Sequence, residues 1–149
     1  MMEEKEKAWK TVSSKYLFRR PWLTVRCEDM LLPNGNHIPE YYILEYPDWV
    51  NTIAITKDGK FVFVRQYRPR LGRTSYELCA GVCDKEDASP LVSAQRELWE
   101  ETGYGKGNWQ EYMVISANPS THTNLTHCFL ATNVEPIDHQ HLEDTEDLS

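Results

Sequence analysis

The chain has 149 residues, of which 40% are apolar and 11% aromatic, and its formal net charge is −7. This length allows one domain with a small subdomain and excludes a multi-domain assembly, while the apolar content indicates a folded globular protein. The negative charge argues against a nucleic-acid backbone or an anionic membrane as the main partner. Small anionic ligands remain possible where local arginines or a metal ion hold them.

Two features of the sequence indicate a cytoplasmic protein. No apolar run reaches the length of a membrane span, and the N-terminal residues MMEEKEKAWK lack the apolar core of a signal peptide. In a reducing compartment we expect core or loop thiols at Cys27, Cys79, Cys83 and Cys128. Four histidines lie in polar segments without a ligand pattern, so loop or capping roles are favoured over metal binding for His122, His127, His139 and His141.

Residues 16–47 have the pattern of an antiparallel β-subdomain. The preceding residues, 1–15, are charged and expected to be frayed. Aromatic and β-branched residues fill 22–32 and 38–46, on either side of Pro33-Asn34-Gly35-Asn36, which is a strong hairpin signal.

The main domain is expected over residues 48–149. In its first part, residues 50–56 and 61–67 have the composition of a second hairpin, and a short strand over 76–79 leads to Gly81. After the next helix, further strands are expected at 112–115 and 125–131. The tail from residue 135 is acidic and lacks apolar periodicity.

A helix is predicted over about residues 90–102. Ser89 is a good N-cap, Pro90 suits the first helical position, and Gly103 can end the helix in the left-handed conformation. One stripe of this helix is expected to pack into the core, and it consists of Leu91, Ala94, Leu98 and Thr102.

Three glutamates, Glu97, Glu100 and Glu101, lie on another face of this helix. At spacings of i, i+3 and i+4 their charges repel each other unless something neutralises them. A divalent cation would do so, and a compact cluster of hard oxygen ligands suits Mg²⁺ or Mn²⁺. A bare acidic run of this kind is more often only a solvated helix face, so the surrounding sequence has to decide between the two interpretations.

The stretch from Gly81 to Tyr104 resembles the Nudix box, in which a glycine and a loop precede a helix carrying R-E-(apolar)-x-E-E and a closing x-G-(apolar). The match here is Arg96-Glu97-Leu98-Trp99-Glu100-Glu101-Thr102-Gly103-Tyr104. One departure is that Asp87 occupies the position of a family glutamate and the arginine follows one residue late. Glu86 and Asp87 are the two residues that could replace that glutamate.

The segment before the box resembles one Nudix branch, the ADP-ribose and nucleoside-diphosphate-sugar pyrophosphatases. The matching motifs are Val64-Arg65-Gln66-Tyr67-Arg68 and Glu77-Leu78-Cys79-Ala80-Gly81, and Pro119 is a weaker third cue. This branch implies an α+β Nudix fold, with a mixed β-sheet sandwiched by helices (α/β/α) and an N-terminal antiparallel β-subdomain. It also implies a homodimer formed through residues 16–47. Relatives normally continue with a further strand and helix, so the Nudix domain over 48–149 is expected to be shortened at its C-terminus.

The resemblance implies Mg²⁺-dependent hydrolysis, with Mn²⁺ as an alternative ion, of the pyrophosphate bond in ADP-ribose or a related nucleotide sugar. The products are a nucleoside monophosphate and a sugar phosphate. Such a reaction requires neutralised phosphate oxygens, an oriented water and a base. The expected metal-binding residues are Glu97, Glu100, Glu101 and Ala80. The expected substrate-binding residues are Arg65, Arg68 and Glu77, with Trp22, Tyr46 and Trp49 as candidates to stack on a nucleobase.

The catalytic base is expected in the acidic segment near the end of the chain. Glu146 is the first choice and Glu143 the alternative, while Glu100 is a third catalytic candidate. Arg96 is expected to have a structural role rather than to contact substrate, since it can pair with box carboxylates and hold the loop. A second hypothesis of another class is a Nudix-fold sensor module that binds a nucleotide sugar without cleaving it. The sequence does not identify the nucleoside diphosphate compound.

Overall fold

A computed structural model describes residues 7–142, 144 and 147–149. Within these residues, no helix combines the length and the apolar character needed to cross a membrane. The chain divides into two compact units. The first contains the residues up to Tyr46 together with Ser116–Asn124, and the second contains Pro47–Ile115 and Leu125–Ser149.

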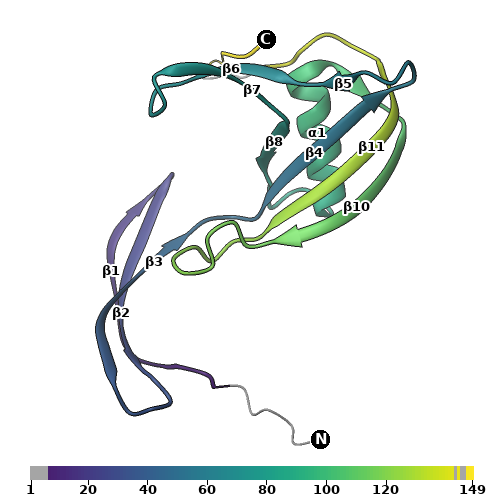
Figure 1. The fold of residues 1–149 in the computed structure, drawn as a ribbon. Coiled ribbons are helices and arrows are strands. Elements are labelled where there is room, and N and C mark those ends of the chain that lie inside the picture. The colour runs from purple at the N-terminus through teal and green to yellow at the C-terminus, as the bar shows by residue number, and fades with distance from the viewer. Residues whose placement is uncertain (1–6, 143, 145–146) are drawn as a thin grey trace, which may run out of the picture. The chain divides into compact units, whose positions relative to one another are not determined.

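The first unit is a three-stranded antiparallel sheet in the order β1-β2-β3 (Figure 1). Its strands are β1 (Lys10–Arg20), β2 (Leu23–Leu31) and β3 (His37–Glu45). The predicted hairpin turn joins β2 to β3, with Gly35 at φ 86°. Within the same unit, the returning loop pairs with β3 where Leu44 N–H donates to Thr121 O at 2.8 Å.

The expectation that residues 1–15 are frayed is wrong from Lys10 onward, where β1 begins. Every residue of β1 is exposed, so burial does not explain the strand. Its pairing with β2 runs from Lys10 opposite Leu31 to Arg20 opposite Leu23. Backbone hydrogen bonds along this register hold a polar segment that composition alone marks as unstructured.

The second unit is built on a mixed six-stranded sheet. Its path is β10 (Asn108–Ile115), β11 (Thr126–Pro136), β4 (Trp49–Thr56) and β5 (Phe61–Val62). The remaining strands are β8 (Cys79–Val82), which pairs with β4, and β9 (Tyr104–Gly105), which pairs with β11. β11 runs parallel to β4, whereas the other pairs are antiparallel.

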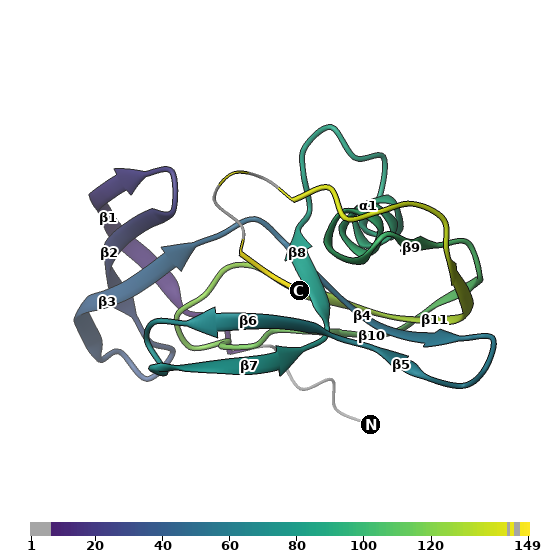
Figure 2. The same cartoon turned by 90° about the horizontal axis from the view of Figure 1, so that it is seen from above.

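The predicted second hairpin is shorter than expected, because only Phe61 and Val62 pair with β4. The chain then starts a separate ribbon, in which β6 (Val64–Arg68) pairs with β7 (Arg73–Glu77). The end of the chain returns beside β6 (Figure 2). There Arg65 N–H donates to Ser149 O at 2.7 Å, and Ser149 N–H donates to Arg65 O at 3.1 Å.

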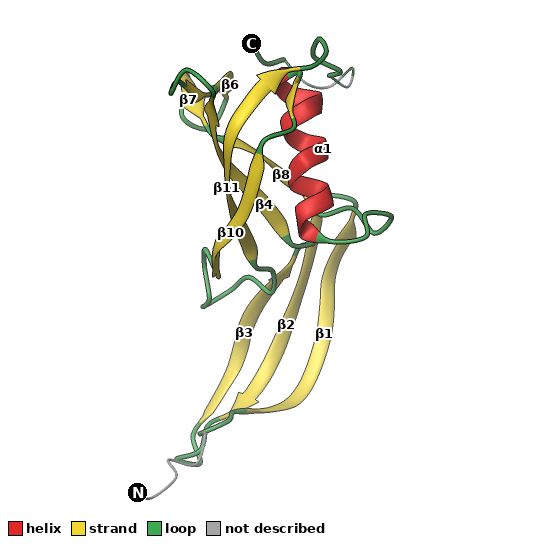
Figure 3. Ribbon diagram, turned by 90° about the vertical axis from the view of Figure 1, so that its right-hand side faces the viewer, coloured by secondary structure: helices red, strands yellow, loops and turns green. Residues whose placement is uncertain are grey.

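Helix α1 (Pro90–Thr102) runs beside the sheet of this unit (Figure 3). Its ends are as predicted: Ser89 Oγ accepts a hydrogen bond from Val92 N–H at 3.4 Å, and Gly103 is left-handed at φ 71°. The main core cluster joins α1, the sheet, β6 and the end of the chain, and it contains Ala54, Val62, Val64, Cys79, Leu98, Ala131, Val134 and Leu148. The α+β prediction is confirmed. The predicted sandwich of helices on both faces of the sheet is wrong for the described residues, because α1 is the one helix among them.

The buried face of α1 differs from the predicted stripe. Ala94 and Leu98 are fully buried as expected, but Leu91 is 37% exposed. Ser93 and Glu101 are buried instead. The reason is that α1 packs closely on β8 as well as on the central strands, which turns the side of the helix carrying Glu101 toward the strand.

Candidate active site

The side chain of Glu97 lies directly against the backbone of β8. A Cβ atom built on Gly81 would be 2.1 Å from Glu97 Cδ and 2.2 Å from Glu97 Oε1. No carbon can approach another group so closely, so only glycine is compatible with this position of the carboxylate. The glycine that opens the box motif therefore makes room for Glu97, which follows much later in the same motif.

The neighbouring residue of β8 holds the second glutamate. Ala80 N–H lies 3.3 Å from Glu101 Oε2 and donates to it, and Glu101 is only 7% exposed. Burying a carboxylate is unfavourable unless hydrogen bonds or a cation compensate for its lost hydration. Glu97 and Glu101 are one helical turn apart, and β8 brings the backbone of Ala80 and Gly81 to both of them.

Arg96 joins the helix carboxylates to the loop before the helix. Its Nη1 group donates to Glu97 Oε1 and to Glu100 Oε2, both at 2.9 Å. Its Nη2 group donates to Val82 O at 3.1 Å and to Asp87 Oδ2 at 3.0 Å. The predicted pairing of Arg96 with box carboxylates is thus present in the structure.

These partners stabilise the charged form of Arg96. Burial alone would lower the pKa of the guanidinium, but hydrogen bonds to Asp87, Glu100 and Glu97 raise it above its ordinary value. Of the two candidates for the missing box glutamate, Asp87 is the one that Arg96 binds, while Glu86 is exposed. The extra loop residue is therefore accommodated without losing the ion pair that fixes the loop.

Arg68 and Glu77 form a second charged pair on the β6-β7 ribbon. Arg68 Nε donates to Glu77 Oε1 at 2.8 Å, and Nη2 donates to Oε2. The hydrogen bond from Arg68 lowers the pKa of Glu77, and Glu77 raises that of Arg68. The charge of Glu101 contributes further to the raised pKa of Arg68, so this arginine lies within electrostatic reach of the buried glutamate. Arg65 is exposed on the same strand.

The other predicted site residues either belong to the first unit or fall outside the described residues. Trp22 and Tyr46 belong to the first unit, where Trp22 is 77% exposed and the Tyr46 ring lies 5.4 Å from the ring of His122. Glu143 and Glu146 lie outside the described residues. The roles of these four side chains stay predictions.

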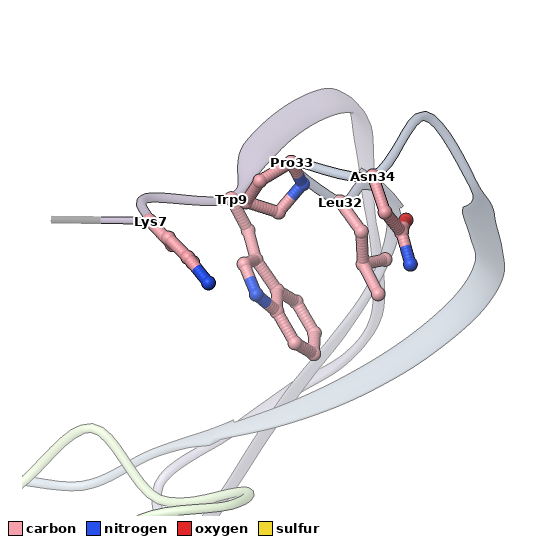
Figure 4. A pocket seen from close by; sticks show the side chains of 5 residues that line it. All are labelled: Lys7, Trp9, Leu32, Pro33 and Asn34. Atoms are coloured by element: carbon pink, nitrogen blue, oxygen red, sulfur yellow. The ribbon is translucent and has the colours of Figure 1, made fainter. Parts of the chain in front are cut away.

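Two surface cavities contain none of the clustered glutamates. The cavity in the first unit has a volume of about 350 Å³ and is lined by Lys7, Trp9, Leu32, Pro33 and Asn34 (Figure 4). None of its described lining residues carries a carboxylate for a metal ion. The cavity in the second unit, of about 270 Å³, is lined by Ser89, Pro90, Leu91, Trp109, Glu111 and Phe129. The candidate site is therefore identified by its charged groups rather than by a deep pocket.

The residues around β8 fit a divalent cation. Glu97, Glu100 and Glu101 supply oxygen donors, which hard divalent ions prefer. Arg96 can balance only one of the negative charges, and it already binds Asp87 as well. The space left by the missing Cβ of Gly81 keeps Glu97 in place beside the strand.

Comparisons with known proteins identify the family and the fold. A family model described as Nucleoside diphosphate sugar hydrolase N-terminal domain matches residues 9–44, and one described as NUDIX domain matches residues 46–148. A solved structure, "Crystal structure of ADP compounds hydrolase", superimposes with a TM-score of 0.81 at 22% identity, over 95% of this chain and 75% of that chain. At this identity the likeness shows the fold, and it confirms the predicted fold class.

Curated relatives show the same kinship. The ADP-ribose pyrophosphatase of Bacillus subtilis (strain 168) is 32% identical over 87% of this chain and 69% of its own length. The Methanol dehydrogenase activator of Bacillus methanolicus is 33% identical over 82% of this chain and 65% of its own length. The ADP-ribose pyrophosphatase of Mycobacterium tuberculosis (strain ATCC 25618 / H37Rv) is 28% identical over 89% of this chain and 63% of its own length. The chain thus spans about two thirds of the length of these relatives.

Proposed function

Because the NUDIX model matches residues 46–148, the chain belongs to the Nudix family, and we propose that it hydrolyses the pyrophosphate bond of ADP-ribose or a related nucleoside diphosphate sugar. The products would be a nucleoside monophosphate and a sugar phosphate. The observation that carries this proposal is the contact of two helix carboxylates with the backbone of β8: Glu97 lies against Gly81, and Glu101 accepts a hydrogen bond from Ala80. The substrate class is supported by the names of two curated relatives and by the N-terminal family model.

The metal ion in this proposal is Mg²⁺, with Mn²⁺ as the alternative. Glu97, Glu100 and Glu101 would hold it, together with the backbone of Ala80. Such an ion neutralises phosphate oxygens and makes water a better nucleophile near neutral pH. Arg96 keeps two of these carboxylates in position through its Nη1 group.

Arg68 is the proposed phosphate-binding residue on the β6-β7 ribbon, and the exposed Arg65 on the same strand is the second candidate. Among the described residues, Glu77 accepts hydrogen bonds from Nε and Nη2 of Arg68. This arrangement orients the guanidinium and leaves Nη1 for a phosphate oxygen. Glu77 therefore acts as a positioning residue in this proposal.

The remaining roles follow from the family resemblance. Glu146 is the proposed base, with Glu143 as the alternative, and Trp22 or Tyr46 would stack on the nucleobase. A homodimer through the first unit is supported by its exposed apolar side chains, among them Val12 and Phe18 on β1 and Trp22 in the turn that follows. The cytoplasmic location stays a prediction from the N-terminal sequence.

The deciding experiment measures product release from ADP-ribose, GDP-mannose and other nucleotide sugars in Mg²⁺, with mass analysis of the products. Glu97→Gln should fold normally but lower turnover by orders of magnitude, because the amide is isosteric but neutral. Glu135→Gln is the matched control, since Glu135 pairs with Lys57 and Lys106 at the surface. Turnover that continues unchanged in excess chelator would contradict the proposal.

The sensor hypothesis makes a different forecast for the same assay. A module that only binds nucleotide sugars would show metal-dependent affinity without any product. The irregular spacing near Asp87 favours that hypothesis at the level of sequence, but Arg96 and Asp87 form their ion pair despite it. The hydrolase is therefore the function that the site supports best.

A further inference from the structure

Three potential metal ligands meet just after β11. One ligand atom each from Asp138, His139 and His141 lies within 4.8 Å of the others. His139 Nδ1 is 2.7 Å from Asp138 Oδ1, and His141 Nε2 is 3.0 Å from Asp138 Oδ2. The two imidazole rings are 4.4 Å apart. Each oxygen of the Asp138 carboxylate thus faces a nitrogen of one imidazole.

The segment that carries these ligands is fixed to the C-terminal end of α1. Asp138 N–H donates to Gly103 O at 3.1 Å, and His141 N–H donates to Glu100 O at 2.8 Å. The side chain of Gln140 donates to Glu101 O at 2.6 Å. These bonds satisfy carbonyl groups that the end of a helix leaves without intrahelical partners. Of the histidines for which a loop or capping role is expected, His141 caps the helix through its backbone N–H.

Two further contacts keep the segment in place. A Cβ atom on Gly103 would be 2.2 Å from Asp138 O, so the close approach of the two segments depends on that glycine. The ring of His141 lies 4.3 Å from the ring of Trp99. The ligands are therefore presented by an anchored backbone, which reduces the entropy lost when an ion orders them.

We propose that Asp138, His139 and His141 bind a divalent transition-metal ion of the Zn²⁺ class. Imidazole nitrogens suit Zn²⁺, Ni²⁺ and Cu²⁺, whereas Mg²⁺ prefers oxygen ligands. Two imidazoles and one carboxylate leave the fourth position of a tetrahedral Zn²⁺ ion for water. This site differs in ligand chemistry from the glutamates of α1 and does not depend on the proposed hydrolase activity.

The test is a calorimetric titration of the full chain with Zn²⁺ in the presence of saturating Mg²⁺, which occupies oxygen-rich sites. The wild type should bind one Zn²⁺ ion at this cluster. His139→Ala and Asp138→Asn should each weaken that binding by at least about tenfold, since even the loss of an outer-shell partner commonly costs this much. His139 is 80% exposed, so its replacement should leave the fold intact.

The matched control is His37→Ala. His37 also pairs with a single carboxylate, with Nδ1 3.0 Å from Asp29 Oδ1, but it lies in the first unit. This variant should bind Zn²⁺ like the wild type. A second readout is the quenching of Trp99 fluorescence by Ni²⁺ or Cu²⁺, which Trp99→Phe should remove. The proposal is overturned if His139→Ala and Asp138→Asn titrate like the wild type, or if Mg²⁺ displaces the Zn²⁺.

Discussion

The carboxylate of Glu97 occupies the space that a side chain on residue 81 would fill. Two parts of the box motif that are distant in sequence are thus one structural feature, because the glycine of β8 is required by the glutamate of α1. Ala80 adds a second link through its bond to Glu101. The helix and the strand therefore hold both carboxylates before any ion binds.

Gly81→Ala tests this relationship. The backbone at Gly81 has ordinary φ, so alanine is tolerated there, but its Cβ must displace Glu97. We expect turnover of ADP-ribose to fall by about 100-fold, since a shift of about 1 Å in a catalytic group can cost this much. The measurement is turnover in Mg²⁺ together with thermal unfolding. Gly59→Ala is the control. Gly59 has φ 79° and no atom near a Cβ built on it, so the alanine variant should lose about 1 kcal/mol of stability through backbone strain while retaining activity.

The sequence was sufficient to predict the ends of α1, because local chemistry determines them. Ser89, Pro90 and Gly103 act within one turn of their own positions, and all three take the predicted roles. The orientation of the helix depends on distant strands, so Leu91 was wrongly expected in the core. Burial of Glu101 could not be read from its spacing for the same reason.

The site was predictable to a similar extent. The box motif predicted Glu97, Glu100 and Glu101. The close contact of Glu97 with Gly81 and the hydrogen bond from Ala80 to Glu101 could not be predicted, because both depend on where β8 lies. The cluster after β11 was missed, because His139 and His141 were judged without their neighbour. The spacing Asp-His-x-His was the available signal. That spacing alone does not show that the three side chains converge, because their convergence depends on how the segment packs on the end of α1.

Asp87→Asn should change the dependence of stability on pH. Burial alone would raise the pKa of Asp87, but hydrogen bonds such as that from Arg96 lower it below the ordinary value of 3.8. The ionised group therefore adds stability that is fully present above about pH 5 and is lost as the pH falls through the lower folded-state pKa.

Urea unfolding at pH 7 and at pH 3 provides the measurement. The Asn variant should be less stable at pH 7 by about 2 kcal/mol, which is typical for a hydrogen bond to a charged partner, and the difference should shrink at pH 3. Asp84→Asn is the control, since Asp84 is more exposed and lies 3.2 Å from Arg96 Nη2. Equal losses for both variants would refute a special role for Asp87.

Phe18→Glu tests the proposed homodimer. Phe18 lies on β1 and is 54% exposed in the single chain, so a charge there should be tolerated by the monomer. In an apolar interface the same charge should cost about 2 kcal/mol, or roughly a thirtyfold weaker association. Light scattering over a range of concentrations measures the mass. Phe61→Glu, at a similarly exposed site in the second unit, should leave the mass unchanged, and a wild type that is monomeric throughout would exclude the dimer.

The last prediction distinguishes a hydrolase from a sensor through the candidate bases. In a hydrolase, replacing the base by an amide should lower turnover by about 100-fold or more while leaving affinity for Mg²⁺ and nucleotide almost unchanged, because a base acts in the transition state. Glu146→Gln is expected to show this effect, and Glu143→Gln serves as its neighbouring control. If the two variants exchange behaviour, Glu143 is the base. If both retain full turnover, proton removal must be assigned to another carboxylate, and Glu100 beside Arg96 is the next to replace. Nucleotide binding without any turnover in the wild type would instead identify the sensor, and then neither substitution should alter affinity.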